Sequence, residues 1–366
     1  MRNNNHFIGN KKAAILIEQG VEDVEFIVPF NGLKQAEIEV IVLGSRMNEK
    51  YKGKRGKLSI QADATTTEVV ADEFAAVVIP GGMAPDKMRR NCNTVWFVME
   101  AMKQGKLIAA VCHGPQVLIE GDLLKGKQVT GFTAICKDIT NAGANYLDEP
   151  VVVDGNLITS REPGDLAIFT TVLLNRLGYG GKDAVLPNEK DTGAEWWKLA
   201  DAWGGSTKNE IVKGLNTALG GERYSLEALE KYLEKESDEE VKNLFQDMIT
   251  NKNQHIKKLE SYLDRLHEKP SLTANIANQY AKLKTALTGT ESIYQIRCAL
   301  GDIQTAIGDI TNLSAMLTDP VATAIFKQIH NNLGKYEQRL IELYRGRIAA
   351  GVRPPKPTSR AAVTQV

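Results

Sequence analysis

The sequence predicts an α/β domain with a parallel, doubly wound sheet, followed by an all-α four-helix bundle. In the first half, apolar runs of strand length alternate with helical patterns, and most of them end at glycine or proline; these runs are residues 13–17, 38–43, 75–79 and 107–111. Fully apolar runs of this length are typical of strands that are buried on both faces of a parallel sheet. Beyond about residue 207 the strand signals cease, and long amphipathic helical patterns follow. The two halves therefore predict two domains of different class.

Two further elements complete the predicted α/β domain, which spans residues 10–177. Residues 151–158 predict a hairpin whose turn is Asp154-Gly155-Asn156. Residues 163–177 have helical spacing and are followed by Gly178, a typical residue after the end of a helix. In sheets of this kind, chemistry gathers outside the carboxyl ends of the strands. The residues that follow the strands are therefore the candidate site.

The strand at residues 107–111 ends at Cys112, and a helical pattern begins at Pro115. Proline has its φ preset for a first helical turn, so Cys112 is expected at a sharp strand-to-helix turn, the geometry of a nucleophile elbow. The nearby helix N-terminus favours thiolate over thiol. We therefore expect Cys112 to have a depressed pKa and to be the most easily oxidised thiol. The alternative is a small buried cysteine that only packs.

Glu22 and Glu25 follow the first strand and lie three residues apart at a predicted helix start, so they share a face of that helix. One of them can reach the thiol. A carboxyl beside a thiol must share a proton with it, and a protonated glutamate can still stabilise a thiolate by hydrogen bonding. The alternative is that both glutamates interact only with the helix dipole.

The glycine pair Gly81-Gly82 follows the third strand. It lets the backbone come close to a ligand, and its amide groups could bind an oxyanion together with the amide of His113. A glycine pair after a strand is by itself weak evidence, because most such pairs are only turns.

The helical half, residues 207–347, contains an internal repeat at an offset of 81 residues. Ala218-Leu219-Gly220 returns as Ala299-Leu300-Gly301. Each half of the repeat predicts a helical hairpin, with its break and N-cap at Ser237-Asp238 or at Thr318-Asp319, and two hairpins make a four-helix bundle. The duplication and the helix lengths resemble the ferritin-like superfamily.

Di-iron members of that superfamily need Glu-x-x-His on two helices. Here the residue three positions before His255 is Lys252, and the residue three positions before His330 is Lys327. A lysine in a ligand position would repel iron, so we expect a metal-free bundle.

Three segments lie outside the two predicted domains. Residues 178–206 predict a glycine-rich, charged linker with a short helix whose tryptophans, Trp196, Trp197 and Trp203, pack between the domains. Residues 271–287 join the two hairpins. Residues 348–366 predict a disordered tail.

The composition excludes several classes of protein. The 366 residues suffice for about two domains, and 45 lysines and arginines balance 45 aspartates and glutamates, so nothing calls for a nucleic acid or a membrane as partner. The polar first residues and the lack of a bilayer-length apolar run predict a cytoplasmic protein. Four scattered cysteines without a C-x-x-C pair argue against a disulfide framework or a structural zinc site. We expect no metal and no cofactor.

The α/β half resembles the ThiJ/PfpI superfamily, and within it the PfpI branch of intracellular cysteine hydrolases and stress proteins. The matching stretches cover about residues 10–177 in the right order; they are residues 20–25, 79–86, 110–116, 131–132, 141–144, 151–156 and 160–166. The resemblance implies a flavodoxin-like sheet of the class I glutamine amidotransferase kind and a nucleophilic Cys112. It also implies homo-oligomers in which neighbouring subunits complete one another's sites.

The resemblance also implies roles for single residues. Glu25 is the first choice for the partner of the thiol, and Glu22 is the second. Adjacent residues at a turn point in different directions, so His113 need not bond its own Cys112. The resemblance implies that His113 works with the cysteine and with an acid from a neighbouring subunit. The position that matches this acid is Asp86, where relatives often have the longer glutamate.

The expected oxyanion and substrate-binding residues are Gly81, Gly82, Gly114 and Phe132. Phe132 departs from the PfpI pattern, because relatives carry a tyrosine there. The departure removes one hydroxyl from the neighbourhood of the substrate.

The sequence lacks the residues that the competing reactions on such a fold require. Glutamine amidotransfer needs a distal histidine in an H-x-E pattern, but no histidine lies between His113 and His255, and the corresponding segment is Ser160-Arg161-Glu162. Serine hydrolysis lacks G-x-S-x-G, and dinucleotide binding lacks G-x-G-x-x-G after a strand.

The sequence thus predicts a PfpI-like, cysteine-dependent hydrolase or stress-response enzyme, of the peptidase/amidase or the glyoxalase/deglycase type, that acts on a small-molecule or peptide substrate through Cys112. The alternative is a redox or stress sensor in which Cys112 is oxidised without turnover and the helical bundle is an assembly module.

Overall fold

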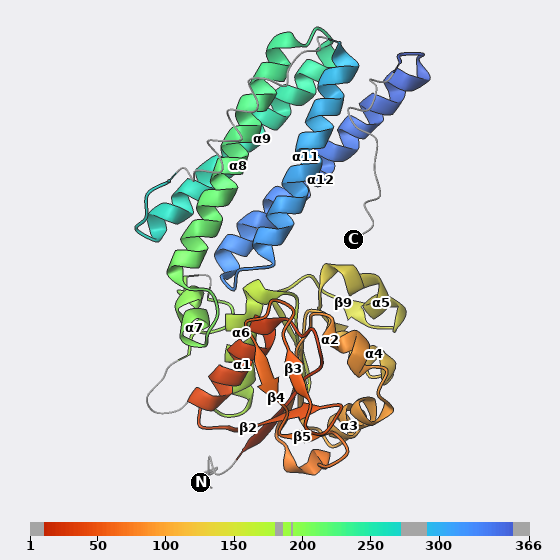
Figure 1. Cartoon of the computed structure of the whole chain (residues 1–366), viewed down its shortest axis with the longest axis vertical. Coiled ribbons are helices and arrows are strands. Elements are labelled where there is room, and N and C mark those ends of the chain that lie inside the picture. The colour runs from red at the N-terminus through yellow and green to blue at the C-terminus, as the bar shows by residue number, and fades with distance from the viewer. Residues whose placement is uncertain (1–10, 180–185, 192, 272–290, 354–366) are drawn as a thin grey trace, which may run out of the picture. The chain divides into compact units, whose positions relative to one another are not determined.

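The computed structural model describes residues 11–179, 186–191, 193–271 and 291–353. The chain divides into two compact units (Figure 1). One unit holds the residues up to Lys208 together with Met316–Pro320, and the other holds Asn209–Ala315 and the residues from Val321 onward. The predicted joining segment after Ser271 lies outside the described residues, as does most of the predicted disordered tail.

A seven-stranded sheet forms the centre of the first unit. Its strand order is β10-β11-β7-β6-β1-β2-β5, and only the β10–β11 pair is antiparallel. The strands are β1 Lys12–Leu16, β2 Glu39–Gly44, β5 Ala64–Thr65, β6 Ala76–Ile79, β7 Leu107–Val111, β10 Val151–Asp154 and β11 Leu157–Ser160. Two small sheets pair β3 Lys50–Lys52 with β4 Ser59–Gln61, and β8 Gln128–Val129 with β9 Asn145–Tyr146. The predicted doubly wound sheet and its closing hairpin are confirmed.

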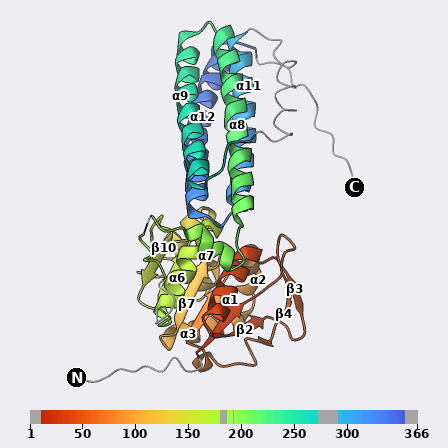
Figure 2. The same ribbon diagram turned by 90° about the vertical axis from the view of Figure 1, so that its left-hand side faces the viewer.

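Helices cover both faces of this sheet, with α1 and α6 on one face and α3 and α4 on the other (Figures 1 and 2). The helices of the first unit are α1 Asp23–Gln35, α2 Ala84–Met88, α3 Cys92–Lys103, α4 Pro115–Glu120, α5 Cys136–Asn141, α6 Leu166–Arg176 and α7 Trp196–Ala202, with 3-10 turns at Ala71–Glu73, Thr133–Ile135 and Pro163–Asp165. Because it is covered on both sides, β7 has five buried residues, as its apolar run predicts.

Two tryptophans of the α7 region, Trp196 and Trp203, extend the core of this unit. From the sequence we expected them to pack between the domains. Trp203 belongs to the main apolar cluster, and its carbonyl oxygen accepts a hydrogen bond of 3.0 Å from Asn31 Nδ2 of α1. Trp196 packs with Ala167 and Ile168 of α6. Helix α7 is therefore fixed to the α/β unit by buried aromatic area.

The second unit is built from long helices that run side by side: α8 Lys208–Lys235, α9 Glu239–Arg265, α11 Ser292–Ser314 and α12 Pro320–Ala349 (Figures 1 and 2). The predicted N-cap at Asp238 is confirmed, because its side chain accepts hydrogen bonds from the amides of Glu240 at 3.0 Å and Val241 at 3.3 Å. Within the described ranges, no helix is long and apolar enough to cross a membrane.

Candidate active site

Cys112 lies at a sharp turn between β7 and α4, as its place in the sequence predicts. Its φ is +59°, a left-handed conformation that non-glycine residues seldom adopt. Neighbouring segments hold it there, because its amide donates to the Ser160 carbonyl oxygen and its carbonyl oxygen accepts from the Phe132 amide, each at 2.9 Å. The strained turn has the geometry that is expected for a nucleophile elbow; the nucleophilic role of Cys112 stays a prediction.

Gly114 lies within this elbow and packs against the backbone. Its amide donates to the Val111 carbonyl oxygen at 2.7 Å, and a Cβ at this position would lie 2.4 Å from the Ile79 carbonyl oxygen. Only glycine permits this close approach. The structure therefore gives Gly114 a role in forming the turn; its predicted contact with substrate stays a prediction.

Glu25 of α1 is fully buried beside the elbow. Its Oε2 accepts a hydrogen bond of 2.8 Å from the Gly81 amide, and its Oε1 has no partner in hydrogen-bond geometry among the described residues. Burial, and then the charge of Glu22, raise the pKa of Glu25 to about 8, against smaller lowering effects of the Cys112 thiol, Gly81 and Lys54. Glu25 therefore keeps a proton at neutral pH.

Burial raises the pKa of the Cys112 thiol well above its ordinary value, and a negative charge on Glu25 raises it further. The backbone amides of Gly82 and His113 act in the opposite direction. The predicted depressed pKa is therefore wrong. Cys112 is only 7% exposed, and the cost of removing water from its thiolate outweighs the stabilising effect of the short helix α4. Cys112 and Glu25 titrate as one coupled pair.

His113 contacts its own Cys112, although adjacent residues at a turn need not do so. Its Nδ1 lies 3.3 Å from Cys112 Sγ, and its ring lies 5.0 Å from the ring of Phe132, centroid to centroid. Burial and the charge of Lys54 lower the pKa of His113, so its imidazole is neutral at pH 7 and can accept a proton. Asp86 is exposed on α2, and its contact with His113 of a neighbouring subunit stays a prediction.

Glu22 occupies the N-cap position of α1 and is paired with cations. Its carboxylate lies 2.5 Å from Arg55 Nε and 3.6 Å from Lys54 Nζ. These partners hold Glu22 in an ion pair, so Glu25 is the carboxyl that the structure places against Cys112. Glu22 acts on the pair only through its charge.

Residues 53–58 form a loop that sequence reasoning missed. Its backbone is held by Asp23, whose carboxylate oxygens accept hydrogen bonds of 2.7 Å from the amides of Arg55 and Leu58. The loop brings Lys54 and Arg55 to Glu22. The signal that could have indicated it is the basic, glycine-containing run of residues 52–57.

Gly81 and Gly82 differ in what their amides can do. The Gly81 amide donates to Glu25 and is not available for a substrate oxyanion. The Gly82 amide acts to lower the pKa of the Cys112 thiol, as does the amide of His113. A Cβ at Gly81 would lie 2.8 Å from Cys112 Cβ, and a Cβ at Gly82 would lie 2.4 Å from the Glu22 amide nitrogen, so side chains are excluded at both positions.

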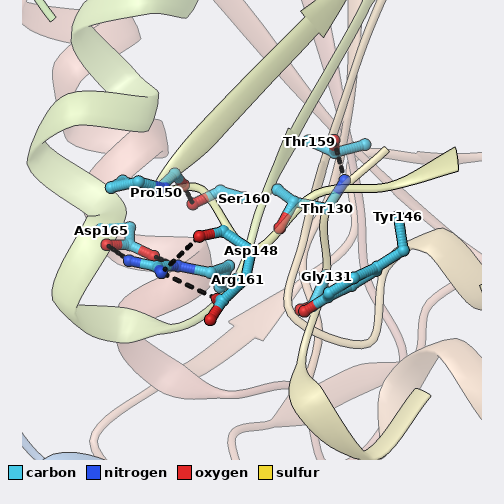
Figure 3. Close-up of polar contacts among 9 residues, drawn as sticks. All are labelled: Thr130, Gly131, Tyr146, Asp148, Pro150, Thr159, Ser160, Arg161 and Asp165. Atoms are coloured by element: carbon cyan, nitrogen blue, oxygen red, sulfur yellow. Dashed lines mark hydrogen bonds and ion pairs between the residues drawn. The ribbon is translucent and has the colours of Figure 1, made fainter. Parts of the chain in front are cut away.

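The loop that carries Phe132 is anchored from two sides (Figure 3). Tyr146 Oη donates to the Gly131 carbonyl oxygen at 3.0 Å, and the Thr130 amide donates to Thr159 Oγ1 at 2.9 Å. Because the Phe132 amide bonds the Cys112 carbonyl oxygen, these anchors also help to hold the elbow. Tyr146 and Thr159 carry no motif, and the sequence did not indicate them.

Arg161, in the segment where an amidotransferase would need its distal histidine, lies between two carboxylates (Figure 3). Its guanidinium contacts Asp165 Oδ2 at 2.9 Å and Oδ1 at 3.1 Å, and Asp148 Oδ1 at 2.9 Å. A bidentate pair of this kind fixes the chain after β11.

The raised pKa of Glu25 predicts a pH-dependent stability. The folded value near 8 lies above the ordinary value of 4.5, so the folded state binds more protons between these limits, and stability is lost as pH rises through this window. The loss amounts to about 5 kcal/mol at most. Urea unfolding from pH 5 to 8.5 should show this fall for the wild type and a much flatter profile for Glu25→Gln. The exposed control Glu100→Gln should follow the wild type, and equal profiles for all three proteins would contradict the assignment.

Among the described residues, no group of three or more His, Cys, Asp and Glu side chains is arranged to hold a metal ion. The chemistry that the described side chains offer at the elbow is that of Cys112, His113 and Glu25.

Comparison with known proteins places these observations in a family. The model of the DJ-1/PfpI family matches residues 11–176. Protein/nucleic acid deglycase 2 of Escherichia coli is 40% identical over 170 residues, which are 46% of this chain and 99% of that protein. A Bacillus subtilis relative named cysteine protease YraA is 40% identical over 168 residues, 46% of this chain and 99% of that protein.

One solved structure is similar over both units. It is the crystal structure of a two-domain protein from Anabaena variabilis that contains DJ-1/ThiJ/PfpI-like and ferritin-like domains, with 74% sequence identity and a TM-score of 0.87. The similarity covers 96% of this chain and 100% of that chain. The helical unit is thus similar to a domain described as ferritin-like.

Proposed function

Because this chain belongs to the DJ-1/PfpI family, we propose that it is an enzyme in which Cys112 attacks an electrophilic carbon, as a hydrolase or a deglycase. The observation that carries the proposal is the strained elbow, which holds Cys112 Sγ 3.3 Å from a neutral His113 and beside a protonated Glu25. A cysteine that only packs needs neither the strain nor a buried carboxyl. Relatives named deglycase and cysteine protease support both types of reaction.

The first chemical step needs the Cys112 thiol to lose its proton. Neutral His113 accepts it at Nδ1, while Glu25 keeps its own proton and donates a hydrogen bond to the sulfur. The thiolate then forms a carbon–sulfur bond to the substrate carbonyl carbon, and the electron pair of the C=O bond moves to oxygen. The Gly82 and His113 amides are the donors that this proposal assigns to that oxyanion, since the Gly81 amide is already bonded to Glu25.

The next step depends on the substrate. With an aldehyde or glyoxal, the oxyanion takes a proton and gives a hemithioacetal. With an amide, the C–N bond breaks, the amine leaves with the proton held by His113, and water then hydrolyses the thioester.

Turnover assays on the full chain test this proposal. Loss of methylglyoxal and cleavage of a small peptide amide are followed with untreated protein and with protein alkylated at Cys112 by iodoacetamide. We expect turnover of at least one substrate before alkylation and none after it. If neither is consumed but peroxide converts Cys112 to the sulfinic acid, the sensor hypothesis replaces the enzyme.

Phe132 offers a test of the substrate side of the site. Phe132→Tyr restores the hydroxyl beside His113, and one hydrogen bond to a bound substrate should raise kcat/KM by about 3- to 10-fold. The matched control Phe30→Tyr, at a half-buried phenylalanine of α1, should leave kcat/KM unchanged. A fall in kcat/KM for Phe132→Tyr would mean that the site requires an apolar ring without a hydroxyl at this position.

A further inference from the structure

A cluster of charged side chains is buried inside the helical unit. Glu222 of α8 and Lys252 and His255 of α9 are each 4% exposed or less. Lys252 Nζ donates to Glu222 Oε1 at 2.7 Å, and His255 Nδ1 lies 2.7 Å from Glu222 Oε2. The two oxygens of one buried carboxylate are thus divided between an ammonium and an imidazole.

The other two long helices complete the surroundings of this cluster. Asn332 Nδ2 of α12 lies 2.9 Å from His255 Nε2. Asp302 of α11 accepts a hydrogen bond of 2.7 Å from Tyr232 Oη of α8. Burial raises the pKa of Asp302, and the hydrogen bond from Tyr232 and then the charge of Lys252 act against that rise. All four helices therefore contribute polar groups to one interior site.

In the half of the pattern that Glu222, Lys252 and His255 form, the spacing follows that of a di-metal bundle with one change. Such bundles take a glutamate from each of two helices and a Glu-x-x-His motif from each of the other two. Lys252-x-x-His255 has the spacing of the Glu-x-x-His motif. Glu222, on the neighbouring helix, contacts both of these residues, as the glutamate outside the motif does in a di-metal bundle. The motif glutamate is replaced by a lysine.

The second half of the pattern is apolar. At the repeat offset of 81 residues, Glu222 corresponds to Ile303 and Lys252 corresponds to Leu333. Ile303 and Leu333 line a small cavity together with Lys252 and Asp302. The half of the site that would supply the second set of carboxylates thus supplies two hydrocarbon side chains, so the residues present do not fit a metal pair.

We infer that the Lys252 ammonium supplies, inside this bundle, the positive charge that bound metal supplies in di-metal bundles, so that the domain holds its buried carboxylate without metal. The electrostatics agree with this role. Burial raises the pKa of Glu222, but Lys252 and His255 together outweigh burial, and the net shift is downward. Glu222 therefore stays ionised and paired. A divalent cation at the same carboxylate would lie close to the ammonium and be repelled.

Exchange of the lysine for the motif's carboxylate tests this inference. In the full chain, Lys252→Glu should create a site for one Co²⁺ per chain, because only one half of the pattern offers ligands. Bound Co²⁺ should raise the Tm of Lys252→Glu. The wild type and the matched control Lys257→Glu, an exposed lysine on the same helix, should show no such rise. Adding Glu222→Gln to Lys252→Glu should abolish the effect.

Two outcomes would overturn the inference. One is a Co²⁺-dependent rise in the Tm of the wild type that is lost in Glu222→Gln. The other is a folded Lys252→Glu protein that binds no more Co²⁺ than Lys257→Glu does.

If Lys252→Glu does not fold, Lys252→Met keeps the inference testable. Without the ammonium, the Glu222 carboxylate loses its main counter-charge. Lys252→Met should therefore have a lower Tm than the wild type at pH 7, and the difference should shrink toward pH 4 as Glu222 of the variant takes up a proton. Equal Tm values at pH 7 would show that Lys252 is not the counter-charge.

Discussion

Replacing Cys112 with serine should lower the turnover of methylglyoxal or of a peptide amide by about 10³-fold or more. Serine has nearly the same size, so it can occupy the same turn, but its hydroxyl ionises far less readily than a thiol. The neighbouring groups are poor bases for a serine hydroxyl, since burial lowers the pKa of His113 and a pKa of about 8 keeps Glu25 protonated at neutral pH. Steady-state kinetics measure the loss, and circular dichroism checks that the fold persists.

The other cysteines of the α/β unit are the matched controls. Cys92 is exposed and Cys136 is partly exposed, and neither lies at a strand end. Cys92→Ser and Cys136→Ser should retain nearly full turnover. Activity that survives in Cys112→Ser but disappears in either control would place the nucleophile elsewhere.

The second large effect concerns Asp86. If Asp86 of another subunit orients His113, Asp86→Asn should lower turnover by about 10²-fold, because an unoriented imidazole is seldom placed to take a proton. Alkylation of Cys112 should continue in this variant, since the thiol depends on Glu25 and on the Gly82 and His113 amides. Asp86→Glu should retain or raise activity, and the exposed control Asp138→Asn should behave as the wild type does.

The same hypothesis makes activity depend on assembly. Dilution below the dissociation constant of the oligomer should lower specific activity while the circular dichroism spectrum stays unchanged. Normal turnover in Asp86→Asn, or a fully active monomer in analytical ultracentrifugation, would leave Cys112, His113 and Glu25 of one chain as the complete catalytic set.

Local patterns in the sequence determined most of the architecture. The apolar run before Cys112 predicts β7, and Pro115 predicts the start of α4, because strand burial and helix initiation depend on neighbours within a few residues. The turn at Asp154-Gly155-Asn156 and the N-cap at Asp238 are equally local, and both are present. The sharp turn at Cys112 follows from these local signals, whereas contacts with Ser160 and Phe132 hold its left-handed φ.

Only the tertiary structure decided which glutamate meets the thiol. Glu22 and Glu25 share a helix face, and spacing alone leaves both within reach. Arg55 and Lys54 pair with Glu22 from a loop more distant in the chain, whereas the Gly81 amide binds Glu25 from the end of another strand. Contacts over such separations depend on the order in which strands pair within the sheet, and no short stretch of sequence encodes that order.

Burial is the other quantity that the sequence could not supply. The thiol was expected to be acidic from its place before a helix, but it is enclosed by β6, β7 and the Phe132 loop, and desolvation reverses the shift. In the same way, the sequence showed Lys252 and His255 on one helix but not Glu222 opposite them. A pKa and a buried ion pair depend on how much water the complete fold removes and on which charges it leaves in place, and both are settled only when distant segments pack together.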